Sequence, residues 1–166
     1  MNERLNLVLD QPHVKSGEAP WWIIFLPISF LAHIAEEWWG GPGFPAWTQN
    51  TLGVAVSPTR FVLMSGSGLL LMTLSVIAAL RDRRAAWLAA TFAAMITVNG
   101  LLHAIATGAY SVYSPGTITG LLAFVPVGSL TLWSMSRCLP RYQFVLATLA
   151  GVAFHAIVLW ITFGFP

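Results

Sequence analysis

Charged residues are scarce in this chain of 166 residues: only 8% are Asp, Glu, Lys or Arg, whereas an ordinary soluble domain carries about 25%. Hydrophobic residues make up 57% of the chain, and the mean hydropathy is +0.73. A chain with so little charge cannot cover a water-exposed surface in the usual way. The composition therefore excludes an ordinary soluble domain and predicts an integral membrane protein whose main partner is the lipid bilayer.

Cysteine is nearly absent, since Cys138 is the single one, and this excludes an internal disulfide. The chain also lacks internal repeats and low-complexity segments. The formal net charge is only +2, and the few basic residues do not gather into a patch, so we expect no nucleic-acid partner. The length allows one domain.

Five apolar segments are each close to the 20 residues that a helix needs to cross a bilayer. Short breaks rich in glycine and proline, or in arginine, separate them. We therefore predict an all-α integral membrane bundle of five transmembrane helices, at residues 21–39, 60–80, 85–107, 117–136 and 142–163. The predicted organisation is an N-terminal tail at residues 1–20 and a transmembrane domain at residues 21–163.

The basic residues predict the orientation of this bundle. With five spans, one side of the membrane holds seven of them, namely Arg4, Lys15, Arg81, Arg83, Arg84, Arg137 and Arg141. The other side holds only Arg60. Positive residues concentrate on the cytoplasmic side, so we predict a cytoplasmic N-terminus, an external C-terminus and a multi-pass protein of the cell membrane. The first segment is not expected to be a cleaved signal peptide, because no small-x-small cleavage site follows it.

Two adjacent carboxylates, Glu36 and Glu37, lie within the first apolar segment, three and four residues after His33. Each ionised group in a membrane helix costs about 3 kcal/mol on insertion scales, so we expect partners that offset this cost. His33 and Glu37 share a helix face, because residues i and i+4 are neighbours on a helix. Glu36 flanks His33 on its other side.

Polar residues in two later segments fall at the same predicted depth. Asn99 and His103, again spaced i and i+4, lie in the external half of the third segment, and His155 lies in the external half of the fifth. We therefore predict one site in the outer half of the bilayer, built from His33, Glu36, Glu37, Asn99, His103 and His155.

Two loops near this layer have simpler interpretations. Tyr113 and Ser114 could close over the site, but residues 113–116 are more simply an ordinary Ser-Pro-Gly turn. Residues 40–47 indicate a lid or an interfacial hairpin anchored by Trp47. Several glycines are expected to mark close helix packing rather than chemistry; these are Gly66, Gly68, Gly100, Gly108, Gly116 and Gly120.

The motif His33-x-x-Glu36-Glu37, followed by Asn99-x-x-x-His103, the 113–116 turn and a lone His155, resembles the HXXEE-domain membrane proteins. The resemblance covers roughly residues 21–163. It implies a membrane enzyme but no particular activity. Paired glutamates and later histidines also look like the CAAX-processing membrane proteases, but this chain lacks the arginine that should follow the glutamates, and its asparagine precedes the histidine instead of following it.

Metal-dependent catalysis is the function we favour from the residues. Zinc is held by nitrogen and oxygen ligands, and a catalytic site keeps one position open for water. His33, Glu37, His103 and His155 are the candidate ligands, and Glu36, Glu37 and Asn99 are the candidate catalytic residues. We expect one divalent ion, zinc rather than iron, because a di-iron site requires about four carboxylates. The expected reaction is hydrolysis or another modification of a lipophilic small molecule.

Two other functions stay open. A protonated glutamate, stabilised by its neighbouring carboxylate, could drive the isomerisation or cyclisation of a lipid without a metal. Alternatively, two of the histidines could ligate haem or a metal ion in a protein that is not an enzyme. Transport through the membrane is disfavoured, because the cytoplasmic halves of the spans contain no ionisable residue apart from the arginines at helix ends.

Overall fold

The computed structural model describes residues 19–164, and all regular secondary structure in this range is helical. Four helical segments are long and apolar enough to cross a membrane. They are α3 (Pro58–Arg81), α4 (Ala86–Tyr110), α7 (Arg141–Phe163) and the segment Thr117–Cys138, which is formed by α5 (Thr117–Thr119), the π-helical turn η4 (Gly120–Phe124) and α6 (Val125–Cys138). The prediction of an all-α fold is confirmed, and these four segments match four of the five predicted spans.

The first predicted span forms a shorter helical segment than the other four. It consists of a 3₁₀ turn, η1 (Trp21–Ile24), and the 15-residue helix α1 (Phe25–Trp39). At about 1.5 Å per residue α1 measures about 23 Å, and the 3₁₀ turn adds about 8 Å at 2.0 Å per residue. Together they approach the roughly 30 Å of a bilayer core, so the fifth span stays a prediction.

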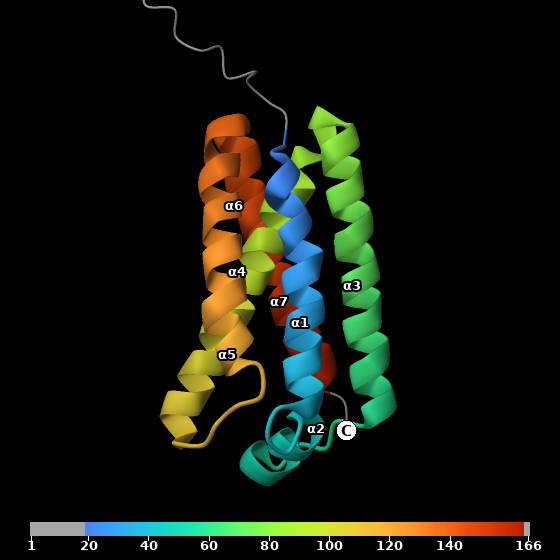
Figure 1. The fold of residues 1–166 in the computed structure, drawn as a ribbon, viewed down its shortest axis with the longest axis vertical. Helices are drawn as coiled ribbons and strands as arrows, with labels where there is room; N and C mark the ends of the chain where they lie inside the picture. The colour runs from blue at the N-terminus through green and yellow to red at the C-terminus, as the bar shows by residue number, and fades with distance from the viewer. Residues whose placement is uncertain (1–18, 165–166) are drawn as a thin grey trace, which may run out of the picture.

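The long helices form an up-and-down bundle (Figure 1). α1, α4 and α7 run in one direction, and α3 and α6 run in the other. The connections at 82–85, which include η3 (Arg83–Ala85), and at 139–140 therefore lie at one end of the bundle. The short helix α2 (Phe44–Trp47), the π-helical turn η2 (Thr48–Leu52) and the loop 111–116 lie at the other end.

The described arginines divide between the two ends as the sequence predicts. Five of them flank the 82–85 and 139–140 connections, namely Arg81, Arg83, Arg84, Arg137 and Arg141, whereas Arg60 begins α3 at the opposite end. Arg4 and Lys15, and most of the predicted tail at residues 1–20, lie outside the described residues. The separation of charge agrees with the predicted orientation, which itself stays a prediction.

Helix α4 is the central element, and it packs against α3, α6, α7 and η4. Its first half is rich in alanine, and Ala89, Ala90 and Ala93 are completely buried. Small side chains allow neighbouring helix backbones to approach closely. A Cβ atom added at Gly151 of α7 would lie only 2.1 Å from the Thr91 carbonyl oxygen of α4. This tight contact holds α4 and α7 side by side, so that the polar residues in their second halves face one region.

Candidate functional site

Helix α1 presents one buried stripe to the bundle, formed by Leu26, Ser29, His33 and Glu37. These positions recur every three or four residues, the spacing of one face of a helix. Leu26 belongs to the apolar core, and the stripe becomes polar toward the end that carries α2. The apolar packing of the first half of α1 therefore fixes the rotation of the helix and directs His33 and Glu37 inward, as the i, i+4 spacing predicted.

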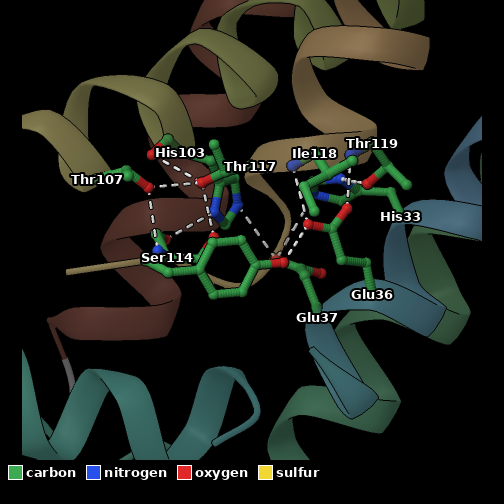
Figure 2. Close-up of polar contacts among 10 residues, drawn as sticks. His33, Glu36, Glu37, His103, Thr107, Ser114, Thr117, Ile118 and Thr119 are labelled. Atoms are coloured by element: carbon green, nitrogen blue, oxygen red, sulfur yellow. Dashed lines mark hydrogen bonds and ion pairs between the residues drawn. The ribbon is translucent and has the colours of Figure 1, made fainter. Parts of the chain in front are cut away.

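His33, Glu37 and His103 meet in the interior, where the ligand atoms of these three residues all lie within 4.8 Å of one another. The Glu37 Oε1 atom lies 3.3 Å from His103 Nε2 and 3.7 Å from His33 Nε2. The side chains come from different helices, α1 and α4, and Figure 2 shows the imidazoles and the carboxylate converging. All three residues are buried. The structure therefore assembles two imidazoles and one carboxylate as a group that could hold a metal ion.

A hydroxyl group holds each imidazole on the side away from Glu37. His33 Nδ1 lies 2.9 Å from Thr119 Oγ1, and His103 Nδ1 lies 3.0 Å from Ser114 Oγ. A hydroxyl oxygen can accept a hydrogen bond from an Nδ1–H group. In that tautomer both Nε2 atoms carry lone pairs that face the carboxylate. Metal-ligating histidines commonly donate their second ring N–H to such a partner.

The backbone passes directly over the two imidazoles at Gly116. This residue has φ = +102°, a conformation that strains residues with a side chain. A Cβ atom at this position would lie 2.7 Å from His33 Cε1 and 3.0 Å from His103 Nδ1. Only glycine fits this position without displacing a ring, so the 113–116 turn forms one wall of the site.

Glu36 lies apart from the cluster of imidazoles and forms a different set of contacts. Its carboxylate accepts hydrogen bonds from Tyr113 Oη at 2.5 Å, from the Ile118 N–H at 2.9 Å and from the Thr119 N–H at 2.6 Å. Ile118 and Thr119 belong to the first turn of the segment 117–138, where N–H groups lack partners in the helix. Glu36 of α1 therefore caps another helix, and a carboxylate at a helix N-terminus is also favoured by the helix dipole.

These contacts differ from two expectations. Glu36 was expected to be a catalytic residue beside His33, and that role stays a prediction; its two oxygens instead bond the Tyr113 hydroxyl and cap the helical segment 117–138. The 113–116 turn was expected to be ordinary, but Tyr113 bonds Glu36 and Ser114 bonds His103. Burial and the hydrogen bond to Glu36 raise the pKa of Tyr113 to about 12, so this phenol keeps its proton and remains a donor.

Asn99 and His155 line the same cavity as His33, Glu37 and His103 but do not belong to that group of three. The cavity has a volume of about 630 Å³, and His33, Glu37, Asn99, His103 and His155 line it. The Oδ1 atom of Asn99 and the Nε2 atom of His155 are buried and have no hydrogen-bond partner among the described residues. The structure thus brings five of the six predicted site residues to one cavity, with His155 apart from the ligand group.

Helix α2 covers the cavity at the end that is predicted to be external. The Phe44 ring contacts the rings of Phe61, His103 and Phe163, with centroids 5.9 to 6.5 Å apart. Trp47 is only 4% exposed and also lines the cavity. The alternative in which Trp47 anchors an interfacial hairpin is therefore wrong, because its side chain is directed into the protein. The position of α2 agrees with the alternative of a lid.

Sequence reasoning missed the hydroxyl groups around the cluster. Thr107 and Thr117 lie 2.7 Å apart, and the Thr107 hydroxyl accepts a hydrogen bond from the Ser114 N–H at 3.0 Å. Ser114 also contacts His103 of α4, whereas Thr119 contacts His33 of α1, so these hydroxyl groups link the turn and the segment after it to both helices. The available signal was the concentration of Ser and Thr at positions 114, 117 and 119, directly after the segment that carries His103.

A family model described as a protein of unknown function with HXXEE motif matches residues 24–133 of the chain. The matched range contains α1 with His33 and the two glutamates, α4 with His103, and the 113–116 turn; it does not include His155. No curated protein and no solved structure matches the chain.

Proposed function

The chain belongs to the HXXEE family, and we propose that it is a membrane-embedded enzyme that binds one divalent metal ion through His33, Glu37 and His103. The observation that carries the proposal is the buried group of two imidazoles and a carboxylate whose ligand atoms lie within 4.8 Å of one another. We further propose that the enzyme hydrolyses, or otherwise modifies, a lipophilic small molecule.

Electrostatics supports a cation at this point. A buried carboxylate is costly unless a positive charge compensates it, and the described residues that line the cavity include no Lys and no Arg. If the Ser114 and Thr119 hydroxyls accept from Nδ1, two Nε2 lone pairs and a carboxylate oxygen face one another at 3.3 and 3.7 Å. Such an arrangement is repulsive unless a metal ion or a proton lies among these atoms.

The composition of the group favours zinc. Zinc accepts histidine nitrogen and carboxylate oxygen, and its catalytic sites combine three protein ligands with one open position. A di-iron site of the four-carboxylate type does not fit, because Glu36 is engaged by Tyr113 and the first turn of α5. Haem also fits poorly, because the Glu37 carboxylate lies beside both Nε2 atoms and the imidazole centroids are only 5.0 Å apart.

The surrounding residues suggest how an ester or amide would be cleaved. A bound zinc ion would supply a water molecule with a lowered pKa. Hydrolysis would join a water oxygen to the acyl carbon and break the bond from this carbon to the leaving oxygen or nitrogen, and the proton released by the water would pass to the leaving group. We assign proton acceptance and return to His155, whose buried Nε2 faces no other partner among the described residues. Asn99 would orient the substrate through its side-chain amide.

The test of the metal site is elemental analysis of the purified protein, comparing wild type with His103→Ala and Glu37→Gln. We expect near-stoichiometric zinc in the wild type and its loss in both variants, because removing a ligand should cost more than the 10–100-fold in affinity that loss of an outer-shell partner causes. His155→Ala is the matched control: it removes a buried histidine of the same cavity but should keep the zinc.

Absence of any metal from well-folded wild-type protein, even after loading with zinc and with iron, would overturn the metal site. Equal zinc in the wild type and both ligand variants would overturn the assignment of ligands. The folding of each variant is checked by its elution as a single species in size-exclusion chromatography.

The second candidate function is metal-free acid–base catalysis, as in a lipid isomerase or cyclase. The contact of 3.3 Å between Glu37 Oε1 and His103 Nε2 favours it, because a carboxylate and an imidazole at this distance can share a proton. This function becomes the preferred one if the wild-type protein binds no metal, and Glu37→Gln would then abolish proton transfer.

A further inference from the structure

The cavity of about 630 Å³ continues well beyond the polar cluster. Its walls come from α1, α3, α4 and α7, and α2 with η2 closes one end. Away from the cluster most of its surface is apolar, with contributions from Phe30, Leu71, Met95, Phe154 and Leu159. Cavities of roughly 300–1,000 Å³ with apolar walls and a few placed polar groups are typical of binding sites for small molecules.

We infer that this cavity binds a neutral lipid with a single polar end group, such as a long-chain or polycyclic ester, aldehyde or alcohol, and that the lipid enters directly from the bilayer. The inference rests on the proposed function, because it places the polar end group beside His33, Glu37 and His103. It adds the class of substrate and the direction from which the substrate arrives.

The charge of the lining argues for a neutral end group. The described residues that line the cavity carry one carboxylate and no Lys or Arg. A phosphate group is typically bound by Arg or Lys, and here it would face the Glu37 carboxylate instead. The volume also suits one chain or one ring system rather than a phospholipid with two chains.

The lining residues themselves indicate access from the membrane. Leu71 on α3, Ile105 on α4 and Ile161 on α7 line the cavity and are also exposed, by 49%, 62% and 36% respectively. The cavity therefore reaches the outer apolar surface of the bundle. Helix α3 packs against α1 and α4. It also contacts α7, where the Thr162 hydroxyl donates a hydrogen bond to Met64 Sδ of α3 at 3.6 Å.

Phe44 and Trp47 of α2 line the cavity at its other boundary. The Phe44 ring of α2 packs against His103, and Trp47 packs against Phe44 and Tyr110. The Nε1 atom of Trp47 is buried without a partner among the described residues, and Trp47 lines the cavity. An indole N–H can only donate a hydrogen bond, so the bound lipid is expected to carry an oxygen that accepts one.

The experiment uses the full chain in phosphatidylcholine nanodiscs and two photoactivatable diazirine probes, a long-chain alcohol and a phosphatidylcholine. After irradiation, peptide mass spectrometry locates the labelled residues. We expect the alcohol probe to label residues inside the cavity, such as Met95 and Phe154. We expect the phosphatidylcholine probe to label only the outer surface, such as Leu63 and Leu74, which are 67% and 54% exposed.

A pair of neighbouring substitutions tests occupancy. Ser65 lines the cavity, whereas a Cβ at Gly66 meets nothing within 4 Å. Ser65→Phe should reduce cavity labelling by the alcohol at least about fivefold, because overpacking a filled site costs about 1–3 kcal/mol. Gly66→Phe should leave the labelling unchanged. Ala106→Phe, on the α4 wall, replaces Ser65→Phe if that variant fails to fold.

Equal labelling of the cavity by both probes would overturn the inference of a neutral lipid. Equal loss of labelling in Ser65→Phe and Gly66→Phe, or no loss in either cavity variant, would overturn the assignment of the cavity as the binding site. Zinc content is measured on the same samples. Because Ser65→Phe leaves the ligands in place, failure of the lipid inference and failure of the metal site give different results.

Discussion

At the scale of single residues, the two adjacent glutamates have different environments. Glu37 is buried against two imidazoles, whereas Glu36 points toward the start of another helix. The difference follows from the roughly 100° that each residue turns around a helix axis. Only one of two consecutive side chains can point along the buried stripe of α1. We therefore interpret Glu37 as a metal ligand and Glu36 as a positioning residue.

Conservative substitutions should separate these two roles. In Glu36→Gln, an amide N–H₂ replaces one acceptor and faces backbone N–H groups of the first turn of α5 or the Tyr113 hydroxyl. Hydrogen bonds to charged groups contribute about 1.5–3 kcal/mol each, so we expect a stability loss of about that size with zinc retained. Glu37→Gln should lose zinc without a comparable loss of stability in the metal-free protein. Thermal unfolding of both metal-free variants, together with zinc content, provides the measurement.

The interpretation of Glu36 would be contradicted by a Glu36→Gln protein that is as stable as the wild type. Tyr113→Phe serves as a control, because it removes one donor to Glu36 and leaves the two backbone donors in place. Its loss of stability should be the smaller one.

At the scale of elements, the π-helical turn η4 determines how the segment 117–138 meets α4. The backbones touch at Gly100 and Gly120: a Cβ at Gly100 would lie 2.6 Å from the Gly120 carbonyl oxygen. Gly100 lies one turn before His103, so this contact holds the start of the segment, with Thr119, next to the imidazoles. π-Helical turns frequently occur at functional sites, and this one lies beside the cluster.

Close packing along α4 predicts a strong position dependence for glycine substitutions. Gly151→Ala places a methyl group 2.1 Å from a backbone carbonyl oxygen of α4, so the helices must move apart, at a cost of at least about 1–3 kcal/mol. Gly66→Ala faces open space and should be neutral or stabilising by up to about 1 kcal/mol. Thermal unfolding in detergent measures both. An equal effect of the two substitutions would mean that α7 does not pack on α4 at this distance.

At the scale of the whole molecule, the connections of the bundle concentrate arginine at one end (Figure 1). His33, Glu37 and His103 lie in the halves of α1 and α4 that are nearer the other end. The positive residues on one side predict that this side is cytoplasmic. The external half of the protein would then contain the group His33, Glu37 and His103, together with the 113–116 turn and helix α2. Substrate would come from the outer leaflet.

Cysteine labelling tests this orientation. In a Cys138→Ser background, single cysteines are introduced at Arg83, at Gln49 and at Asn2. With five spans and a cytoplasmic N-terminus, an impermeant maleimide added to intact cells should label only Gln49→Cys, and the other two positions should react after permeabilisation. Labelling of Asn2→Cys together with Gln49→Cys would show that α1 does not span the membrane. Labelling of Arg83→Cys together with Asn2→Cys, but not of Gln49→Cys, would show the opposite orientation.

Much of the architecture was predictable because it depends on local properties of the chain. Apolar runs of about 20 residues must form helices in lipid, since every backbone polar group needs a partner there. The spacing of His33 with Glu37 likewise determines a shared face. The glycine predictions show the limit: Gly100 and Gly120 touch, whereas Gly66 and Gly108 meet nothing within 4 Å. Whether a glycine lies at a helix contact depends on which face of the neighbouring helix packs against it, and a single sequence does not specify that face.

The sequence by itself predicted a helical membrane protein, resembled the HXXEE family, and predicted ionisable groups from three apolar segments at one depth. Only the tertiary structure decided that His33, Glu37 and His103 converge, that Glu36 caps the segment 117–138, and that the 113–116 turn and Trp47 belong to the cavity. The physical reason is the separation, along the sequence, of the residues that interact. Helix formation and burial in lipid follow from neighbours along the chain, whereas hydrogen bonds such as Glu36 to Thr119 join residues that are 83 positions apart.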